Sequence, residues 1–93
     1  MIKKNSVVDG QIINKIKEEL LKEFKKFKPT ITEADLDLSL QELALDSLDM
    51  VEMAMDMEDK FDIRIQDDEI CFKTTPNEIL EIIKKKLEEN GSN

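Results

Sequence analysis

The sequence predicts a small all-α protein: a four-helix bundle with three longer helices, one short helix, and a long loop between the first two helices. Three stretches carry apolar residues three and four positions apart, which is the period of a helix with one buried face. Residues suited to begin or end helices bound these stretches. The 93 residues suffice for one core, so we expect a single domain over residues 1–93, with a loose leader over about 1–8 and a disordered tail over about 90–93.

Composition limits the partners that the chain can bind. The net charge of −8 argues against nucleic acid, because phosphate contacts need a basic face, and it favours partners with basic patches. No apolar run is long enough to span a bilayer, and no apolar segment follows the first lysines as it would in a signal peptide. We therefore expect a cytoplasmic protein that does not insert into membranes.

The first helix is expected over about residues 10–28, with Ser6 or Asp9 as its cap. Pro29 should end it, because the residue before a proline is pushed out of the helical region. The lysines of its last turn suit the negative end of the helix dipole, and we interpret them as a solvated helix end. The buried face is predicted to consist of Ile13, Ile16, Leu20, Phe24 and Phe27.

A long connection follows over residues 29–45, and a connection of this length inside a compact domain needs a packing reason. Its leucines supply one, because they allow the loop to lie on the core. Capped turns are predicted over residues 32–35 and 39–43. The leucines are Leu36, Leu38, Leu40, Leu43 and Leu45.

The second helix is predicted over about residues 47–60, and its first turn is the most informative part of the sequence. Asp46 suits the N-cap position, and Asp49 lies in the first turn, where the helix dipole favours negative charge. Ser47 is thereby expected at the tip of the helix, facing solvent.

The second helix also carries a stripe of like charges: Asp49, Glu52, Asp56 and Asp59. Like charges on one face repel each other, so helix stability does not explain the stripe and we interpret it as a partner-binding face. Leu48 and Met55 lie at its border. Methionines and small residues should face the core, namely Met50, Met53, Ala54 and Met57, with Val51 beside them.

One acid of this helix, Glu58, falls inside the apolar arc. A bond to the backbone or a side chain of the following loop would account for its position.

The last third of the chain predicts a connector and two helices. Residues 61–65 alternate and should form an extended connector that buries Phe61, Ile63 and Ile65. A short helix is expected over about residues 67–72, with Ile70 and Phe72 as its apolar contacts. Cys71, the only cysteine, can form no intramolecular disulfide, and we expect a residue in or at the edge of the core, not a reactive thiol.

The final helix is expected over about residues 76–89. Thr75 and Glu78 have the spacing of a capping box, with proline at the first helical position. Gly91 should end the helix as a left-handed cap. The buried stripe is predicted to contain Ile79, Leu80, Ile82, Ile83 and Leu87.

The residues Asp46-Ser47-Leu48, followed by Asp49, Glu52 and the later Phe61-Asp62-Ile63, closely resemble the acyl carrier proteins. The resemblance is dense over residues 43–65 and rests elsewhere on the pattern and order of helices. It implies that Ser47, flanked by Asp46 and Leu48, receives 4′-phosphopantetheine from coenzyme A and carries acyl groups as thioesters. It further implies a monomer that serves enzymes of fatty-acid or related polyketide and lipid synthesis.

The same resemblance implies partners: a phosphopantetheinyl transferase and acyl-transferring or synthase enzymes with basic docking patches. They would read the second helix through Leu48, Asp49, Glu52, Met55, Asp56 and Asp59. The sequence departs from the family at Ala44, where glycine is usual. If this position needs a positive φ, alanine costs roughly 1 kcal/mol or more.

Three other functions have some support in the sequence. A carrier of activated amino acids, of the D-alanyl or peptidyl type, shares the fold, although Asp49 looks like the fatty-acid type. An acidic interaction bundle would use Ser47 only as a helix-start residue. A calcium module is suggested by Asp35, Asp37 and Ser39, but Leu40 stands where the turn glycine is needed, so no metal site is expected.

Catalysis by the chain itself is not expected. There is no histidine to serve as a general base, and Ser47 lacks the Gly-x-Ser-x-Gly frame of a hydrolase. We therefore expect a carrier and not an enzyme.

Overall fold

The computed structural model describes residues 10–91, and these form three α-helices and two short 3₁₀ turns. The helices are α1 (Gly10–Phe24), α2 (Ser47–Phe61) and α3 (Pro76–Gly91). The 3₁₀ turns are η2 (Glu33–Asp37) and η3 (Asp67–Glu69), and no strand occurs within residues 10–91. The all-α prediction is confirmed, and the long loop between the first two helices is present.

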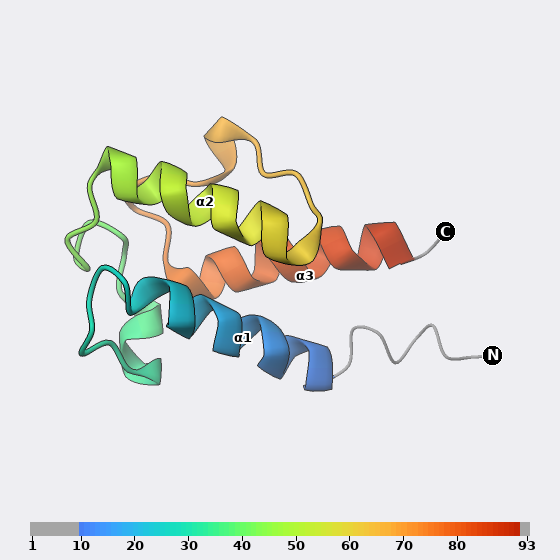
Figure 1. Ribbon diagram of the computed structural model, residues 1–93, viewed down its shortest axis with the longest axis horizontal. Helices are drawn as coiled ribbons and strands as arrows, with labels where there is room; N and C mark the ends of the chain where they lie inside the picture. Colours follow the sequence, from blue (N-terminus) through green and yellow to red (C-terminus); the bar gives the residue numbers. More distant parts are fainter. Residues whose placement is uncertain (1–9, 92–93) are drawn as a thin grey trace.

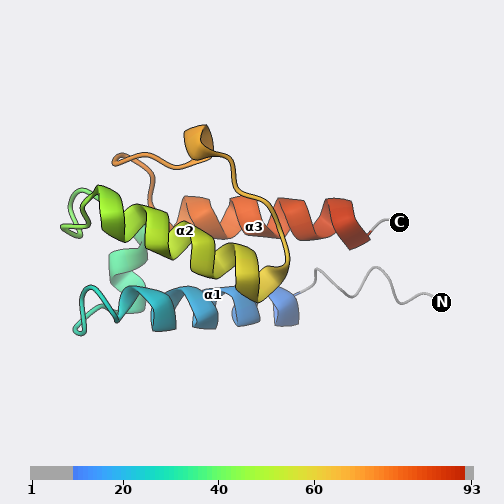
Figure 2. The ribbon, with the colours of Figure 1, turned by 45° about the horizontal axis from the view of Figure 1, so that its top comes forward.

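The helices pack side by side, and α2 and α3 both run in the direction opposite to α1 (Figure 1). α1 packs against both α2 and α3, and η2 packs against α3. The start of α1 and the end of α3 lie at one end of the molecule, whereas the start of α2 lies at the other end (Figures 1 and 2). Ser47 is therefore presented at the end of the bundle formed by the loops.

The core is aliphatic, with Phe24 as its aromatic residue, and every α-helix contributes to it. Burial of each such side chain stabilises the fold by about 1.5–3 kcal/mol. The long loop contributes as predicted, since four of its five leucines are buried and Leu38 is half-buried. The buried apolar residues are Ile16, Leu20, Phe24, Ile31, Leu36, Leu40, Leu43, Leu45, Met53, Met57, Ile63, Ile70, Ile79, Leu80 and Ile83.

The short helix expected over residues 67–72 is confirmed only in part, because the 3₁₀ turn η3 forms over Asp67–Glu69 and no helix continues to residue 72. Ile70 already has an extended backbone (φ −128°, ψ 130°). The chain then makes a turn in which Thr74 N–H donates to the Cys71 carbonyl oxygen (3.0 Å). This turn is joined to the loop before α2, because the N–H groups of Leu40 and Gln41 donate to the carbonyl oxygens of Thr74 (2.9 Å) and Phe72 (3.0 Å), and these bonds oppose a helix there.

The helix ends differ in detail from the predicted bounds. α1 stops at Phe24 and not at residue 28, because the chain tightens into a turn before Pro29, with Lys26 N–H bonded to the Glu23 carbonyl (3.1 Å) and Phe27 N–H to the Phe24 carbonyl (3.0 Å). α2 agrees to within one residue. Gly91 is the last residue of α3 and not a cap beyond residue 89. The expected leader, the caps Ser6 and Asp9, and residues 92–93 of the expected tail lie outside the described residues.

The turns predicted over residues 32–35 and 39–43 and the capping box predicted for the last helix are confirmed. Thr32 N–H donates to Asp35 Oδ2 (3.0 Å), and Ser39 and Glu42 bond each other's backbone N–H groups (2.8 and 3.1 Å). At the start of α3, Thr75 N–H donates to Glu78 Oε1 (2.8 Å), and Glu78 N–H donates to Thr75 Oγ1 (3.1 Å). Each of these motifs depends on residues three apart, which is why the sequence alone predicts them.

Candidate functional site

The first turn of α2 is fixed by two carboxylates that cap each other's backbone. Asp49 N–H donates to Asp46 Oδ1 (2.8 Å), and Asp46 N–H donates to Asp49 Oδ2 (3.2 Å). Both carboxylates lie at the positive end of the helix dipole, which favours them. The predicted cap Asp46 is confirmed, and the structure adds that Asp49 answers it in a reciprocal capping box.

Ser47 is the first residue of α2, and its side chain is exposed as predicted. Leu48 follows it with 79% of its surface accessible. The chain contains no histidine, which is the usual base for a serine hydroxyl. The Ser47 hydroxyl therefore lies on the surface with no histidine of the same chain beside it.

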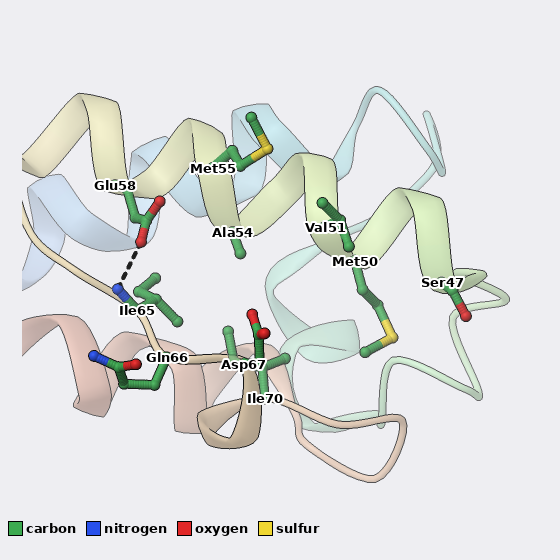
Figure 3. Close-up of a pocket in the computed structure, with 10 residues that line it drawn as sticks. All are labelled: Ser47, Met50, Val51, Ala54, Met55, Glu58, Ile65, Gln66, Asp67 and Ile70. Atoms are coloured by element: carbon green, nitrogen blue, oxygen red, sulfur yellow. Dashed lines mark hydrogen bonds between the residues drawn. The ribbon is translucent and has the colours of Figure 1, made fainter.

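An open groove of about 410 Å³ runs along α2 from Ser47 (Figure 3). One wall is α2 itself, and the other is the segment from Ile65 to Ile70. Ser47 lies at one end of the drawn groove and Glu58 at the other. The lining residues are Ser47, Met50, Val51, Ala54, Met55, Glu58, Ile65, Gln66, Asp67 and Ile70.

The second wall of this groove is tied to the bundle at several points. Ile65 N–H donates to Glu58 Oε2 (2.8 Å), which confirms that Glu58 bonds the following loop (Figure 3). Gln66 N–H donates to Glu69 Oε2 (2.7 Å), and Lys86 Nζ of α3 lies 3.0 Å from the same oxygen. The wall is thus anchored to both α2 and α3.

The outer surface of α2 exposes apolar and acidic side chains together. Leu48, Glu52, Met55 and Asp59 are spaced four, three and four residues apart, so they share one side of the helix, and all four are exposed. Met55 has 58% of its surface accessible. We call these four residues the docking face.

Val51 does not lie in the core as expected, because 55% of its surface is accessible. Met53 and Met57 are buried as predicted, while Met50 and Ala54 are half-buried and line the groove. The side of α2 that was expected to pack on the core faces the groove instead. Val51 is therefore exposed at the rim of the groove.

Two acids of the predicted stripe are engaged in bonds within the fold. Asp49 caps the helix, and Asp56 Oδ2 lies 3.1 Å from Lys26 Nζ in the turn after α1. The hydrogen bonds from Glu23 and then from Lys26 lower the pKa of the Asp56 carboxyl. Of the predicted partner residues, the structure therefore brings Leu48, Glu52, Met55 and Asp59 to one free surface and leaves Asp49 and Asp56 partly occupied.

The expectation for residues 71 and 72 is wrong. Cys71 and Phe72 are both exposed, Phe72 with 42% of its surface. A hydrogen bond from the Thr74 hydroxyl, 3.6 Å from Cys71 Sγ, is the main cause that lowers the pKa of this thiol, and Lys73 adds to it. Lys73 stands two residues after Cys71 in the sequence, so this basic neighbour can be read from the sequence alone.

Sequence reasoning missed the groove wall and the buried acids of α1. Gln66, Asp67 and Ile70 face Ser47's helix only because of the path of the loop, which no local pattern reports. Glu19 and Glu23 are buried. For Glu23 a signal existed, since it follows Ile16 by two helical turns and so shares its buried side.

The part of the chain that the structure describes shows neither a metal-binding group of side chains nor a membrane-spanning helix. Across residues 10–91, no three His, Cys, Asp or Glu side chains are grouped so that they could hold a metal ion. Within the same range, no helix has the length and apolar character needed to cross a membrane.

A small helical bundle that exposes a serine at the start of an acidic helix, beside an apolar groove, has the form of a carrier domain. The family model described as "Phosphopantetheine attachment site" matches residues 12–83. This match covers α2, all of α1 but its first two residues, and the first half of α3, and it includes the whole groove.

Several curated relatives are similar over most of their length. The acyl carrier protein of Cyanophora paradoxa is 38% identical over 78% of this chain and 70% of its own length. The acyl carrier protein homolog of Mycoplasmopsis pulmonis is 39% identical over 76% and 94%. The acyl carrier protein of Lactobacillus johnsonii is 37% identical over 84% and 95%. No solved structure gives a significant match.

The chain belongs to the acyl carrier protein family, and its cofactor is covalently attached 4′-phosphopantetheine. Proteins of this family interact with synthase and transferase enzymes.

Proposed function

We propose that Ser47 is the attachment residue, and that the chain is a cytoplasmic, monomeric carrier of acyl thioesters for enzymes of fatty-acid or related lipid and polyketide synthesis. The observation that carries this proposal is the position of Ser47: exposed, at the start of α2, and at the end of an apolar groove. Asp46 and Leu48 complete the attachment motif, with Asp46 fixing the turn that presents the serine.

The attachment step needs little from the chain beyond a reachable hydroxyl. Ser47 Oγ attacks the phosphorus next to the pantetheine unit of coenzyme A, and a new P–O bond forms to Oγ. The bond from that phosphorus to the 3′,5′-ADP unit breaks, and 3′,5′-ADP leaves. The hydroxyl proton passes to a base of the transferase, because the chain has no histidine of its own. The chain is thus a substrate and carrier, not a catalyst.

The docking face suits enzymes that place arginine or lysine side chains around an apolar depression. Leu48 and Met55 supply apolar contact, while Glu52 and Asp59 supply charge on the same side of α2. Exposed charge pairs steer encounter more than they add affinity, and salt screens them. We therefore expect weak, salt-sensitive complexes, with Asp49 and Asp56 contributing less than the sequence suggested because both are already bonded.

The groove favours an alkyl cargo. Met50, Val51, Ala54 and Ile70 offer apolar contact along it, and burying apolar surface is favourable at about 25 cal/mol per Å². A charged aminoacyl group gains nothing from such contact and loses hydration. This contrast supports an acyl carrier over a carrier of activated amino acids.

The test is the intact mass of the protein before and after incubation with a broad-specificity phosphopantetheinyl transferase and coenzyme A. Wild type should gain one phosphopantetheine, and the Ser47→Ala variant, which keeps the Asp46 cap, should gain none. A folded, previously unmodified wild type that gains nothing would overturn the proposal. The acidic helix would then be interpreted as the surface of a non-carrier interaction bundle.

A further inference from the structure

A cluster of three charged residues joins α1 to α2 on the side of α2 away from the groove. Lys26 Nζ lies 3.3 Å from Glu23 Oε1 and 3.1 Å from Asp56 Oδ2. Glu23 belongs to α1 and is only 1% exposed, whereas Lys26 and Asp56 reach solvent. One cation thus serves two carboxylates from two different elements.

Glu23 is poorly satisfied as a carboxylate. Both of its oxygens are buried, and neither accepts a hydrogen bond in good geometry, so its contact with Lys26 is an ion pair only. A carboxylate can only accept, so two facing carboxylates can bond each other only when one carries a proton. Burial is the main cause that raises the pKa of Glu23 to about 7, and the Asp56 carboxyl adds to the rise.

The other buried acid of α1, Glu19, stands in contrast. Its carboxylate lies 3.2 Å from Lys60 of α2, 3.4 Å from Lys15 and 3.9 Å from Lys22. The bond to Lys60 is the main cause that lowers its pKa. Glu19 is surrounded by cations and stays ionised, whereas Glu23 shares a single lysine.

The charged groups near the cluster come from α1, the turn after it, and α2. α1 contributes Glu19 and Glu23, the turn contributes Lys26, and α2 contributes Asp56 and Lys60. Two ion pairs of α3 lie elsewhere, between Lys84 and Glu81 and between Lys86 and Glu69.

We propose that Glu23, Lys26 and Asp56 form a proton-sensitive latch between α1 and α2. With Glu23 protonated, its carboxyl donates to Asp56, Lys26 neutralises Asp56, and the two helices are held together. When Glu23 loses its proton, two negative charges meet at one cation in a buried position. α1 then packs less firmly on α2, and the folded state loses stability.

The direction of the pH effect follows from linkage. The pKa of Glu23 is raised in the folded state to about 7 from an ordinary value of 4.5. The stability it contributes is therefore fully present below about pH 4.5 and is lost as the pH rises to about 7. The folding equilibrium constant should fall by on the order of 100-fold between pH 5 and pH 8.

The latch is independent of cargo and of the proposed modification of Ser47. It can be measured on unmodified protein, and it should persist in the Ser47→Ala variant. A failure of the latch therefore leaves the carrier proposal intact, and the reverse also holds.

The test is urea unfolding, followed by helix circular dichroism, at pH 5 and pH 8. Three proteins are compared: wild type, Glu23→Gln, and the control Glu18→Gln, which removes the same charge from an exposed position of α1. Wild type and Glu18→Gln should lose stability steeply as the pH rises. Glu23→Gln should lose at least tenfold less in folding constant, because a neutral amide has no proton to release.

Direct titration of Glu23 by carboxyl-carbon NMR of the wild type covers the case in which Glu23→Gln does not fold. A Glu23 titration midpoint near pH 7 in the wild type that becomes lower in the Asp56→Asn variant supports the latch. In that variant Lys26 would pair with Glu23 alone. A Glu23 midpoint near 4.5, or parallel pH curves for all three urea-unfolded proteins, would overturn it.

Discussion

The carboxylate of Glu58 on α2 accepts a hydrogen bond from the backbone N–H of Ile65, 2.8 Å away and seven residues further along the chain. This bond fastens the start of the groove's second wall to the helix that forms the first wall (Figure 3). It also explains an acid inside the apolar arc of α2. The Glu58 side chain therefore helps to set the position of Ile65, which also packs against the core, and with it the width of this end of the groove.

Replacing Glu58 with alanine should lower the free energy of unfolding by about 1.5 kcal/mol, because a hydrogen bond to a charged acceptor is lost and a backbone N–H loses its partner. Hydrogen exchange at the Ile65 amide should become faster. Glu58→Gln keeps an acceptor oxygen and should cost less. The control Glu52→Ala changes an exposed acid of the same helix. Equal effects of Glu52→Ala and Glu58→Ala would contradict this role for Glu58.

Ala44 adopts a left-handed backbone (φ 67°), three residues before Ser47. The position expected to need glycine therefore does need a positive φ, and the alanine is strained by roughly 1 kcal/mol. Ala44→Gly should raise the free energy of unfolding by about 0.5–1 kcal/mol in urea. Ala34→Gly, in η2 at a residue without positive φ, should lower it. A loss of stability in both variants would show that the strain is absent.

The docking face should control the rate of modification. Reversing the charge of Glu52 with lysine should lower the transferase's kcat/KM for the unmodified protein by about tenfold at low salt, and by less at high salt, because screening weakens steering. Glu18→Lys makes the same charge change on the exposed side of α1. Steady-state rates at two ionic strengths measure both variants. If they slow the reaction equally, net charge and not this face is responsible.

A larger side chain inside the groove should reduce the stabilisation that an attached acyl chain gives. Ala54 lies half-buried in its middle, so Ala54→Leu adds apolar volume where an alkyl chain would lie. An attached octanoyl thioester should stabilise wild type against urea relative to the unacylated protein, because apolar surface is buried. The gain should shrink in Ala54→Leu and remain in Ala34→Leu, which lies outside the groove. An unchanged gain in Ala54→Leu would place the cargo elsewhere.

The loss of folding stability at acid pH should depend on Glu69. The hydrogen bond from the backbone of Gln66, and then the pairing with Lys86, lower the pKa of Glu69. A lowered pKa contributes stability that is present above the ordinary value of 4.5 and is lost as the pH falls below it. Glu69→Gln should therefore flatten the loss of stability between about pH 4.5 and pH 3 in urea titrations. If Glu69→Gln loses as much stability as the wild type over this pH range, the role of Glu69 is contradicted.

Features that depend on neighbours along the chain were predictable from the sequence. The caps at Asp46 and Thr75 join residues three apart, and the buried stripes of α1 and α3 follow the helical period. The bond of Glu58 could be anticipated in kind, because an acid in an apolar arc needs a partner. Ser47 as the attachment residue stays a prediction, although the family that its motif suggested is now shown.

Features that depend on distant parts of the chain were not predictable. The short helix expected over residues 67–72 forms only as η3 and gives way to a turn, because Leu40 and Gln41 bond Thr74 and Phe72. The same path of the chain creates the groove and exposes Val51. Glu23 becomes part of a cluster only because α2 brings Asp56 against Lys26.

The two backbone bonds from Leu40 and Gln41 to the segment after η3 have a mechanical consequence. The groove's second wall is held at one end by Glu58 and at the other by the loop that leads into Ser47. Between these two attachments, Lys86 of α3 pairs with Glu69 of η3 at 3.0 Å, so the middle of the wall is held as well. An alkyl cargo of the kind proposed for the groove would therefore meet a wall with little freedom to move outward, and widening the groove would load the loop that leads into Ser47.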